Sequence, residues 1–447
     1  MLDRRRAIWA LVCLACLALL IAPAVWNGFP LLQYDTGGYL APWYEGKLET
    51  NRPVAYGLLL IAGRRMDFWP ALIVQSALTI WVLALTLRAH RLGGRPLLLL
   101  GMIAALSVFT TLPWLTAILL TDTFAGLGVL ALYLLLLRDD TLRHGERIGL
   151  VLLVAFSAAT HSGTLAILIA LTACGMLVAL IDRKRLPPIR LTRAVTALAL
   201  GTLLVFASDA VVTKRIGWPP GGYALSFGRM LQDGIVNRYL DDHCPDPTLR
   251  LCAYKNELPR DPDDFFWGGD SVFSKLGRFD GMNNELRRIA LESLAEYPLL
   301  QLKSVLTETA SQLVRVRTGA GVVKWAWDTY FTIEKVAPEA APAMKAAHQQ
   351  LGELSFEDIN RLQVPLAWLT MALLPIIAWR GWRRPDFADV GELAAAATLA
   401  ILANAAVFGT LATAHHRYGA RIAWIAALVC MIALARRLIY PTDHDNR

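Results

Sequence analysis

Long apolar runs separated by short polar turns dominate the pattern along the chain. A run of about 20 apolar residues is long enough to cross a bilayer as a helix. The pattern predicts about ten such helices, at approximately 7–28, 69–88, 96–113, 122–137, 148–162, 163–181, 193–211, 363–380, 391–411 and 419–437. We therefore expect an all-α polytopic membrane protein, in which the first run is a retained helix and not a signal peptide.

Two longer polar stretches interrupt this pattern. The first, 29–68, contains an apolar segment, Val54–Arg65, that is too short to span and is expected to form a helix at the membrane surface. The second, 212–361, is the only candidate for a domain outside the bilayer. The expected organisation is an N-terminal transmembrane module (1–211, which includes the 29–68 loop), a mostly helical domain (212–361) and C-terminal transmembrane helices (362–447).

Within 212–361, apolar spacing predicts two consecutive helices at Asn284–Tyr297 and Pro298–Val316, with the proline in a first turn. Cys244 and Cys252 lie close together in a polar, proline-bearing stretch, where we expect a disulfide. Two unpaired thiols are the alternative.

Composition supports a membrane protein, and charge indicates its topology. The chain is 55% hydrophobic and only 18% charged, whereas soluble proteins carry about 25% charged residues. The net charge of +8 comes from basic clusters at helix ends, as the positive-inside rule requires, so we expect no nucleic-acid partner. The clusters predict cytoplasmic termini in a bacterial inner membrane, with 29–68 and 212–361 on the periplasmic face.

Two carboxylates lie where predicted helices meet this outer face. Asp35, in the motif Tyr34–Tyr39, is a candidate general base, and Asp122 is a candidate second catalytic acid group beside the fourth helix. The alternatives are a helix cap or a salt bridge to Arg52 for Asp35, and an N-cap for Asp122.

Basic residues gather at the same depth. We expect His416, Arg417 and Arg421 to form an anion site, because arginine can hold phosphate oxygens in a bidentate fork, and His161 is a candidate ligand at the same depth. Snorkelling of the arginines to lipid headgroups and a structural role for the histidine are the alternatives. The candidate substrate-binding residues are Tyr34, Tyr39, Tyr56 and Tyr418.

With these motifs the chain resembles the GT-C superfamily of membrane glycosyltransferases, such as protein mannosyltransferases and aminoarabinose transferases, which use polyprenyl-phosphate sugars as donors. The resemblance covers the order of elements over most of the chain. Its motifs are the Asp35 motif after the first helix, Arg52-Pro53-Val54-Ala55-Tyr56, which is similar to the family's Arg-Pro-x-x-Tyr, Asp122 before the fourth helix, His161, and Arg417-Tyr418. The proline that commonly follows Arg-Tyr in the family is absent here, and Asp35 stands without the family's second acidic residue.

The resemblance implies an inverting transfer of a sugar from a polyprenyl-phosphate donor to an envelope glycan, lipid or protein acceptor. Asp35 would orient or deprotonate the acceptor hydroxyl. The departing lipid phosphate would be stabilised by Arg52, His161, Arg417 and Arg421. No metal-ligand spacing such as His-x-x-x-His occurs among the outer residues, so we name no metal ligand and leave the cofactor open.

Two other functions fit the same pattern. An envelope polysaccharide polymerase or O-antigen-ligase-like enzyme would use outer arginines and histidines without needing Asp35. A lipid-linked sugar transporter would need internal repeats and charges near the bilayer midplane, and the chain shows no clear repeat.

Overall fold

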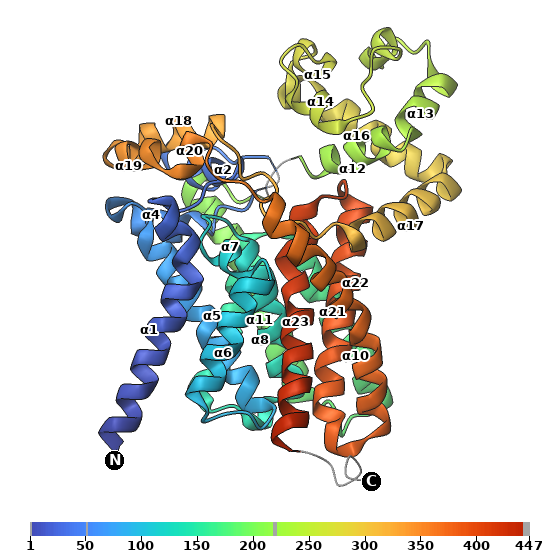
Figure 1. Cartoon of the computed structure of the whole chain (residues 1–447). Helices are drawn as coiled ribbons and strands as arrows, with labels where there is room; N and C mark the ends of the chain where they lie inside the picture. Colours follow the sequence, from blue (N-terminus) through green and yellow to red (C-terminus); the bar gives the residue numbers. More distant parts are fainter. Residues whose placement is uncertain (1, 51, 218–220, 441–447) are drawn as a thin grey trace. The chain divides into compact units, whose positions relative to one another are not determined.

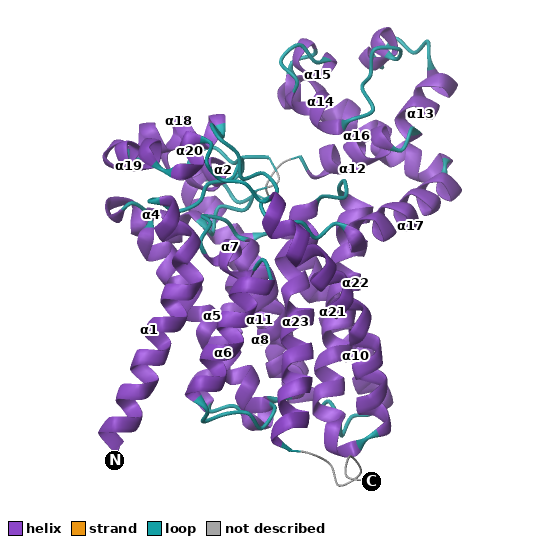
Figure 2. Ribbon diagram, in the orientation of Figure 1, coloured by secondary structure: helices purple, strands orange, loops and turns teal. Residues whose placement is uncertain are grey.

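The computed structural model describes residues 2–50, 52–217 and 221–440, and it is helical (Figures 1 and 2). Within these ranges there is no β-strand, and the only extended pairing is an isolated bridge between Leu31 and Ile118. The prediction of an all-α fold is confirmed.

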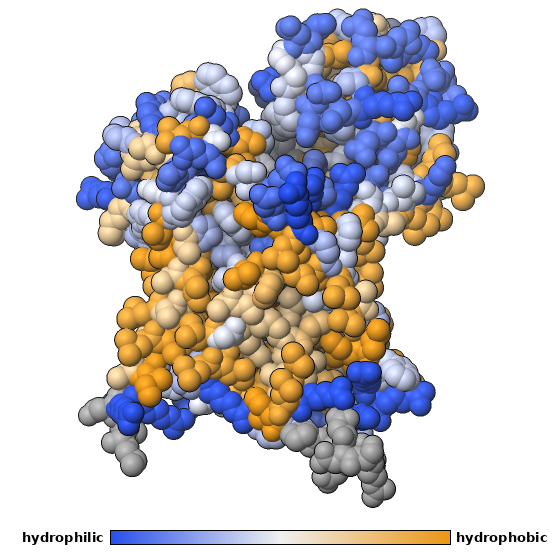
Figure 3. Space-filling model, in the orientation of Figure 1, coloured by the Kyte–Doolittle hydropathy of each residue, from blue (hydrophilic) through white to orange (hydrophobic). Residues whose placement is uncertain are grey.

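Seven described helices are long and apolar enough to cross a membrane, which identifies a multi-pass membrane protein by length and composition. They are α1 (Leu2–Asn27), α5 (Trp69–Ala89), α10 (Ser162–Ile181), α11 (Pro188–Thr213), α21 (Glu357–Arg383), α22 (Ala388–Leu411) and α23 (His416–Ile439). Apolar side chains cover much of the surface that these helices present in Figure 3.

Three shorter helices fall on the remaining predicted spans: α6 (Pro96–Phe109), α8 (Asp122–Leu137) and α9 (His144–Thr160). Helix α8 is buried from Asp122 to Leu136, because it packs against α5, α9, α10, α11 and α23. An all-round apolar sequence is typical of such a central helix. Each of the ten predicted ranges therefore overlaps a helix of the structure, and the range 96–113 also reaches Leu112, where another short helix begins.

Short helices and loops gather at the end of the bundle where α1 ends and α23 begins. They are α2 (Thr36–Leu40), α3 (Pro42–Glu45), α4 (Gly57–Gly63), η1 (Arg64–Met66), α7 (Leu112–Thr116), α18 (Trp327–Val336), η4 (Pro338–Ala340), α19 (Ala341–Ala346) and α20 (His348–Leu351). The segment Val54–Arg65 is thus helical only from Gly57 onward, since Val54–Tyr56 forms a buried turn.

The chain divides into two compact units. The first comes from Met1–Trp218, Val316–Asn404 and His416–Arg447, and the second from Pro219–Arg315 and Ala405–His415. The second unit is shorter than the 212–361 domain expected from the sequence. Its boundary falls at Arg315 because α18 packs on α2, so the stretch after Val316 belongs with the transmembrane helices.

The second unit has its own apolar core. Its elements are α12 (Gly222–Gln232), α13 (Ile235–His243), η3 (Arg250–Tyr254), α14 (Pro262–Trp267), α15 (Val272–Lys275), α16 (Arg278–Glu296) and α17 (Pro298–Val314). Phe227, Phe265 and Phe273 are fully buried at its centre. The two helices predicted at 284–297 and 298–316 correspond to α16 and α17.

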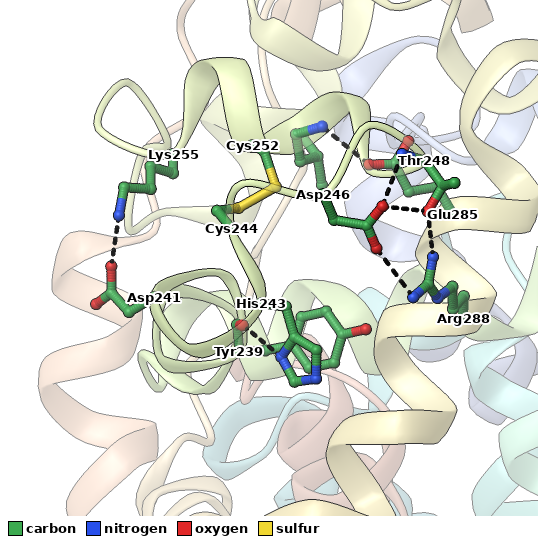
Figure 4. Close-up of a disulfide and its surroundings, with 11 residues drawn as sticks. Tyr239, Asp241, His243, Cys244, Asp246, Thr248, Cys252, Lys255, Glu285 and Arg288 are labelled. Carbon is green, nitrogen blue, oxygen red and sulfur yellow. Dashed lines mark hydrogen bonds and ion pairs between the residues drawn. A yellow bond between two sulfur atoms is a disulfide. The ribbon is translucent and has the colours of Figure 1, made fainter.

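A disulfide joins Cys244 and Cys252 in this unit, with 5.6 Å between their Cα atoms (Figure 4). The loop that it closes is also tied to α16. Arg288 Nη2 lies 3.3 Å from Asp246 Oδ2, and the Leu251 amide donates to Glu285 at 2.9 Å.

The basic residues at the opposite ends of the helices are paired across the bundle. Arg436 contacts Asp389 at 2.5 Å, Arg193 contacts Asp139 at 2.5 Å, and Arg138 and Arg88 pair with Glu392 and Glu146. Asp139 lies in the short helix η2 (Asp139–Thr141). Asp389 lies in α22, shortly after the short helix η5 (Pro385–Phe387). These charges therefore form ion pairs between different helices.

Candidate functional site

The site begins with the loop that follows α1. Gln33 fixes it locally, since its side-chain oxygen accepts from the Asp35 amide at 2.7 Å. Thr36 donates to the Leu119 carbonyl at 2.9 Å and accepts from the Gln33 amide at 3.1 Å. These bonds satisfy the backbone of the turn and leave the Asp35 carboxylate for other partners.

Two glycines allow close approach around Asp35. A Cβ on Gly38 would lie 2.9 Å from Cδ of Arg52, and one on Gly37 would lie 2.7 Å from Cα of Thr329. Real Cβ contacts are not that short, so a side chain at position 37 would clash with backbone, and one at position 38 would displace the Arg52 side chain. The Gly37-Gly38 pair therefore serves packing, as Gly38 leaves room for the arginine that reaches Asp35.

Asp35 is held by two arginines from distant parts of the chain. Its Oδ1 accepts from Arg52 and its Oδ2 accepts from Arg417. Arg417 also donates through Nε to Asp122 Oδ2 at 2.6 Å. The structure thus brings together the candidate residues of the first loop, the start of α8 and the first turn of α23.

Arg421 of α23 also belongs to this network. It is fully buried, with Nη1 3.7 Å from Asp122 Oδ1 and with Nε and Nη2 each 3.3 Å from Asn404 Oδ1. We call Asp35, Arg52, Asp122, Arg417 and Arg421 the Asp35 network. Its three arginines exceed its two aspartates by one formal charge, and the more exposed Glu49 lies 4.0 Å from Arg52.

The arginines set the protonation of Asp35. Burial alone would raise the pKa of this carboxyl, but Arg52 and Arg417 outweigh burial and hold the pKa well below its usual range. Asp35 is therefore ionised at neutral pH.

His161 lies near the network in a neutral form. Burial, together with the charges of Arg421 and Arg417, holds the pKa of its imidazole well below the usual value. Its Nδ1 accepts from the Gly163 amide at 3.0 Å, so the remaining proton is on Nε2. His161 can donate a hydrogen bond here but does not supply a positive charge.

The four candidate tyrosines differ in exposure. Tyr39 and Tyr56 are buried against each other, with ring centroids 5.5 Å apart, and Tyr56 donates to Gln75 at 2.7 Å. Tyr34 is 55% exposed. The Tyr418 ring lies 5.9 Å and 5.7 Å from the guanidinium carbons of Arg417 and Arg421. Tyr39 and Tyr56 are thus buried packing partners, while Tyr34 is exposed.

His416 directly precedes Arg417 at the start of α23. Its Nδ1 accepts from the Arg317 amide at 3.3 Å. Arg317 is exposed, and its guanidinium makes no ion pair with any residue in the described ranges. Sequence reasoning did not place Arg317 in the site, and its position before the turn Thr318-Gly319-Ala320-Gly321 is a weak signal.

A small cavity of about 30 Å³ adjoins the network, and its lining includes Asp122, Arg317 and Arg417. A cavity of this size holds about one water molecule. Nη2 of Arg417 is buried and donates to no acceptor within the described part of the chain. The ion pairs of Asp35 therefore close the site, with one strong donor left unused.

Two further residues that sequence reasoning missed hold the first loop in place. Thr329 of α18 accepts from the Gly37 amide and donates to the Gln33 carbonyl, both at 2.8 Å. Gln349 of α20 accepts from the Leu32 amide at 3.0 Å and donates to its carbonyl at 2.7 Å. A threonine and a glutamine in short amphipathic helices carry no signal of such a role.

No group of three or more His, Cys, Asp or Glu side chains that could hold a metal ion occurs among the residues that the structure describes. Comparison with known protein families, with curated proteins and with solved structures finds no match for this chain. The function must therefore be argued from the site itself.

Proposed function

We propose that this protein is a GT-C-type membrane glycosyltransferase that moves a sugar from a polyprenyl-phosphate donor to an envelope glycan, lipid or protein. The observation that carries the proposal is the Asp35 network, which joins an aspartate after the first helix to arginines of the Arg52 motif and of the Arg417-Tyr418 pair. Acidic and cationic groups for both halves of the reaction thus meet at one end of the apolar helices.

The cations fit the donor half of the reaction. Arg417 and Arg52 keep 11% and 24% of their side chains exposed, and Arg417 has an unused N–H donor. A phosphate oxyanion is a strong acceptor for such groups. Arg421 is fully buried and acts indirectly by holding Asp122.

Donor binding would also prepare the base. In the closed site the two arginines make Asp35 a weak proton acceptor. A lipid phosphate that takes their N–H groups raises the proton affinity of Asp35. The acceptor hydroxyl then gives its proton to Asp35 while its oxygen bonds to the anomeric carbon, and the bond from that carbon to the lipid phosphate breaks with inversion.

The proposal includes a topology. Helices α6, α8 and α9 cross the bilayer with the seven longer helices, giving about ten spans with cytoplasmic termini in a bacterial inner membrane. The network and the 212–361 segment then lie on the periplasmic side. The paired basic residues at the opposite helix ends are consistent with a cytoplasmic face.

Phosphate binding is the first test. We expect the full chain in lipid nanodiscs to bind a polyprenyl phosphate, and Arg417→Gln to weaken this binding about ten- to hundredfold through the loss of charged hydrogen bonds. Arg183→Gln is the control, since Arg183 is exposed in the turn between α10 and α11. Equal binding by both variants would contradict the proposed phosphate site.

Sugar transfer is the second test. With labelled polyprenyl-phosphate sugars and an envelope fraction as acceptor, we expect Asp35→Asn to lower transfer by about 10²-fold or more while phosphate binding persists. Full transfer by Asp35→Asn contradicts the proposed role and favours the polymerase or ligase alternative. Uptake of the labelled donor into proteoliposomes without transfer would instead indicate a transporter.

A further inference from the structure

Helix α17 of the second unit is amphipathic, but its polar face is buried and its apolar face is exposed. Its buried side chains are polar, and they are Gln301, Ser304, Glu308 and Gln312. Its exposed face carries Leu299, Leu302 and Leu306, which are 79%, 55% and 63% exposed. A helix on a water-soluble domain normally shows the opposite arrangement. The exposed face is thus built for an apolar environment.

The polar face cannot turn outward, because its side chains are bonded inside the unit. Arg229 of α12 is 2% exposed and donates to Gln301 at 2.6 Å and to Ser304. Ser304 in turn donates to Asp233. Rotating α17 to cover its leucines would break these buried charged hydrogen bonds, so the orientation of the leucines is fixed.

The other end of α17 contacts the end of α22 and the turn between α22 and α23. Gln312 donates to the His415 carbonyl at 3.0 Å and accepts from the His415 amide at 2.9 Å. Arg315 donates to the Ala414 carbonyl at 2.9 Å. Gly409 of α22 allows this contact, since a Cβ there would lie 2.8 Å from the Glu308 carbonyl carbon. The C-terminal end of α17 therefore lies against the end of α22 and the turn that follows it.

We propose that α17 is an interfacial helix, which inserts Leu299, Leu302 and Leu306 into the lipid leaflet next to the end of α22. The exposed Lys303 lies on the same stretch and makes no ion pair with a described residue, so its amine can reach lipid phosphates. In Figure 3 apolar side chains are visible where Figure 1 shows α17. The inference concerns the second unit and does not depend on the proposed function.

Depth measurement by spin labelling tests the proposal. The full chain with Cys13, Cys16, Cys174 and Cys430 replaced by serine keeps the Cys244–Cys252 disulfide. Leu302→Cys and Leu306→Cys then carry the label in nanodiscs, and Asp270→Cys, at an exposed position on the same unit, is the matched control.

We expect labels at 302 and 306 to collide with oxygen in preference to a polar nickel complex, and to lie about 5–10 Å below the phosphates. The label at 270 should show the reverse preference. Labels at 302 and 306 that behave like the one at 270 would overturn the proposal. Labels that neither reagent reaches would overturn it too, because a protein surface would then cover this face.

Discussion

At the residue scale, Arg417 organises the candidate site. One guanidinium joins Asp35 of the first loop to Asp122 of α8, and it retains an N–H group without an acceptor in the described residues. Both aspartates accept from this one guanidinium, although the three arginines of the Asp35 network still exceed its two aspartates by one formal charge. An incoming phosphate therefore competes with Asp35 for the same donors.

The pH dependence of stability should reveal this pairing. The folded state holds the pKa of Asp35 below the unfolded value of about 3.9. Its stabilising contribution is therefore present above that value and is lost as the pH falls through the lower folded-state pKa. Asp35→Asn should cost about 2–3 kcal/mol, less than the roughly 3–5 of a fully buried pair, because Asp35 is 25% exposed.

Heat unfolding of the detergent-solubilised protein, followed by fluorescence, measures the effect. The difference between the wild type and Asp35→Asn should be constant from about pH 8 to about pH 5 and shrink below about pH 4. Asp270→Asn, at an exposed position, should show no such difference. A difference that already shrinks between pH 7 and pH 5 would mean that the arginines do not hold Asp35 as described.

At the element scale, short helices from 327–351 hold the loop after α1 in place. Thr329 on α18 and Gln349 on α20 satisfy backbone groups of residues 32–37 that would otherwise be buried without partners. Buried backbone groups are nearly always paired. These side chains thus supply the hydrogen bonds that a strand or helix would otherwise give the loop backbone, and they set the position of Asp35.

Replacing Thr329 tests this dependence. Thr329→Val keeps the shape of the side chain but leaves the buried Gly37 amide without its acceptor, which should cost about 1–3 kcal/mol. Thr329→Ser keeps the hydroxyl and should stay within about 1 kcal/mol of the wild type. Thermal unfolding and limited proteolysis of 324–336 provide the measurement. Equal destabilisation by both variants would indicate a packing role instead.

At the scale of the whole molecule, the sequence predicts the membrane helices better than the contacts between distant segments. Each of the ten predicted runs overlaps a helix, and seven of these described helices are long and apolar enough to cross a bilayer. Asp35, Arg52, Asp122 and Arg417 could be grouped in advance because they share one predicted depth. The Asp35–Arg52 ion pair could also be named in advance, as an alternative role for Asp35. The bonds of Arg417 to Asp35 and Asp122 could not, since they join residues hundreds of positions apart.

The boundary of the second unit could not be predicted from the sequence either. The polar segment after α11 continues without a break in composition through Arg315, where the chain passes from one unit to the other. The reversed face of α17 is equally hidden, because its periodicity alone does not say which side is buried. Both the boundary and the buried face of α17 depend on which residues pack against them, and the sequence does not reveal those residues.

Because the chain divides into two units, we expect the disulfide to stabilise only the second unit, which contains it. Closing a loop with the spacing of Cys244 and Cys252 should stabilise the second unit by about 2–3 kcal/mol. The bonds of Asp246 and Leu251 to α16 persist without it, so the unit should loosen without losing its core. In the full chain, Cys244→Ser/Cys252→Ser should therefore increase proteolysis within 219–315.

The first unit provides the contrast, since its helices share no part of that loop. Cleavage within 324–351 should keep the wild-type rate in the double variant. Cys174→Ser, which removes a free thiol of α10, should change neither rate. Faster cleavage at 324–351 together with 219–315 would show that the two units unfold as one, and unchanged cleavage at both would show that the contacts with α16 suffice to hold the loop.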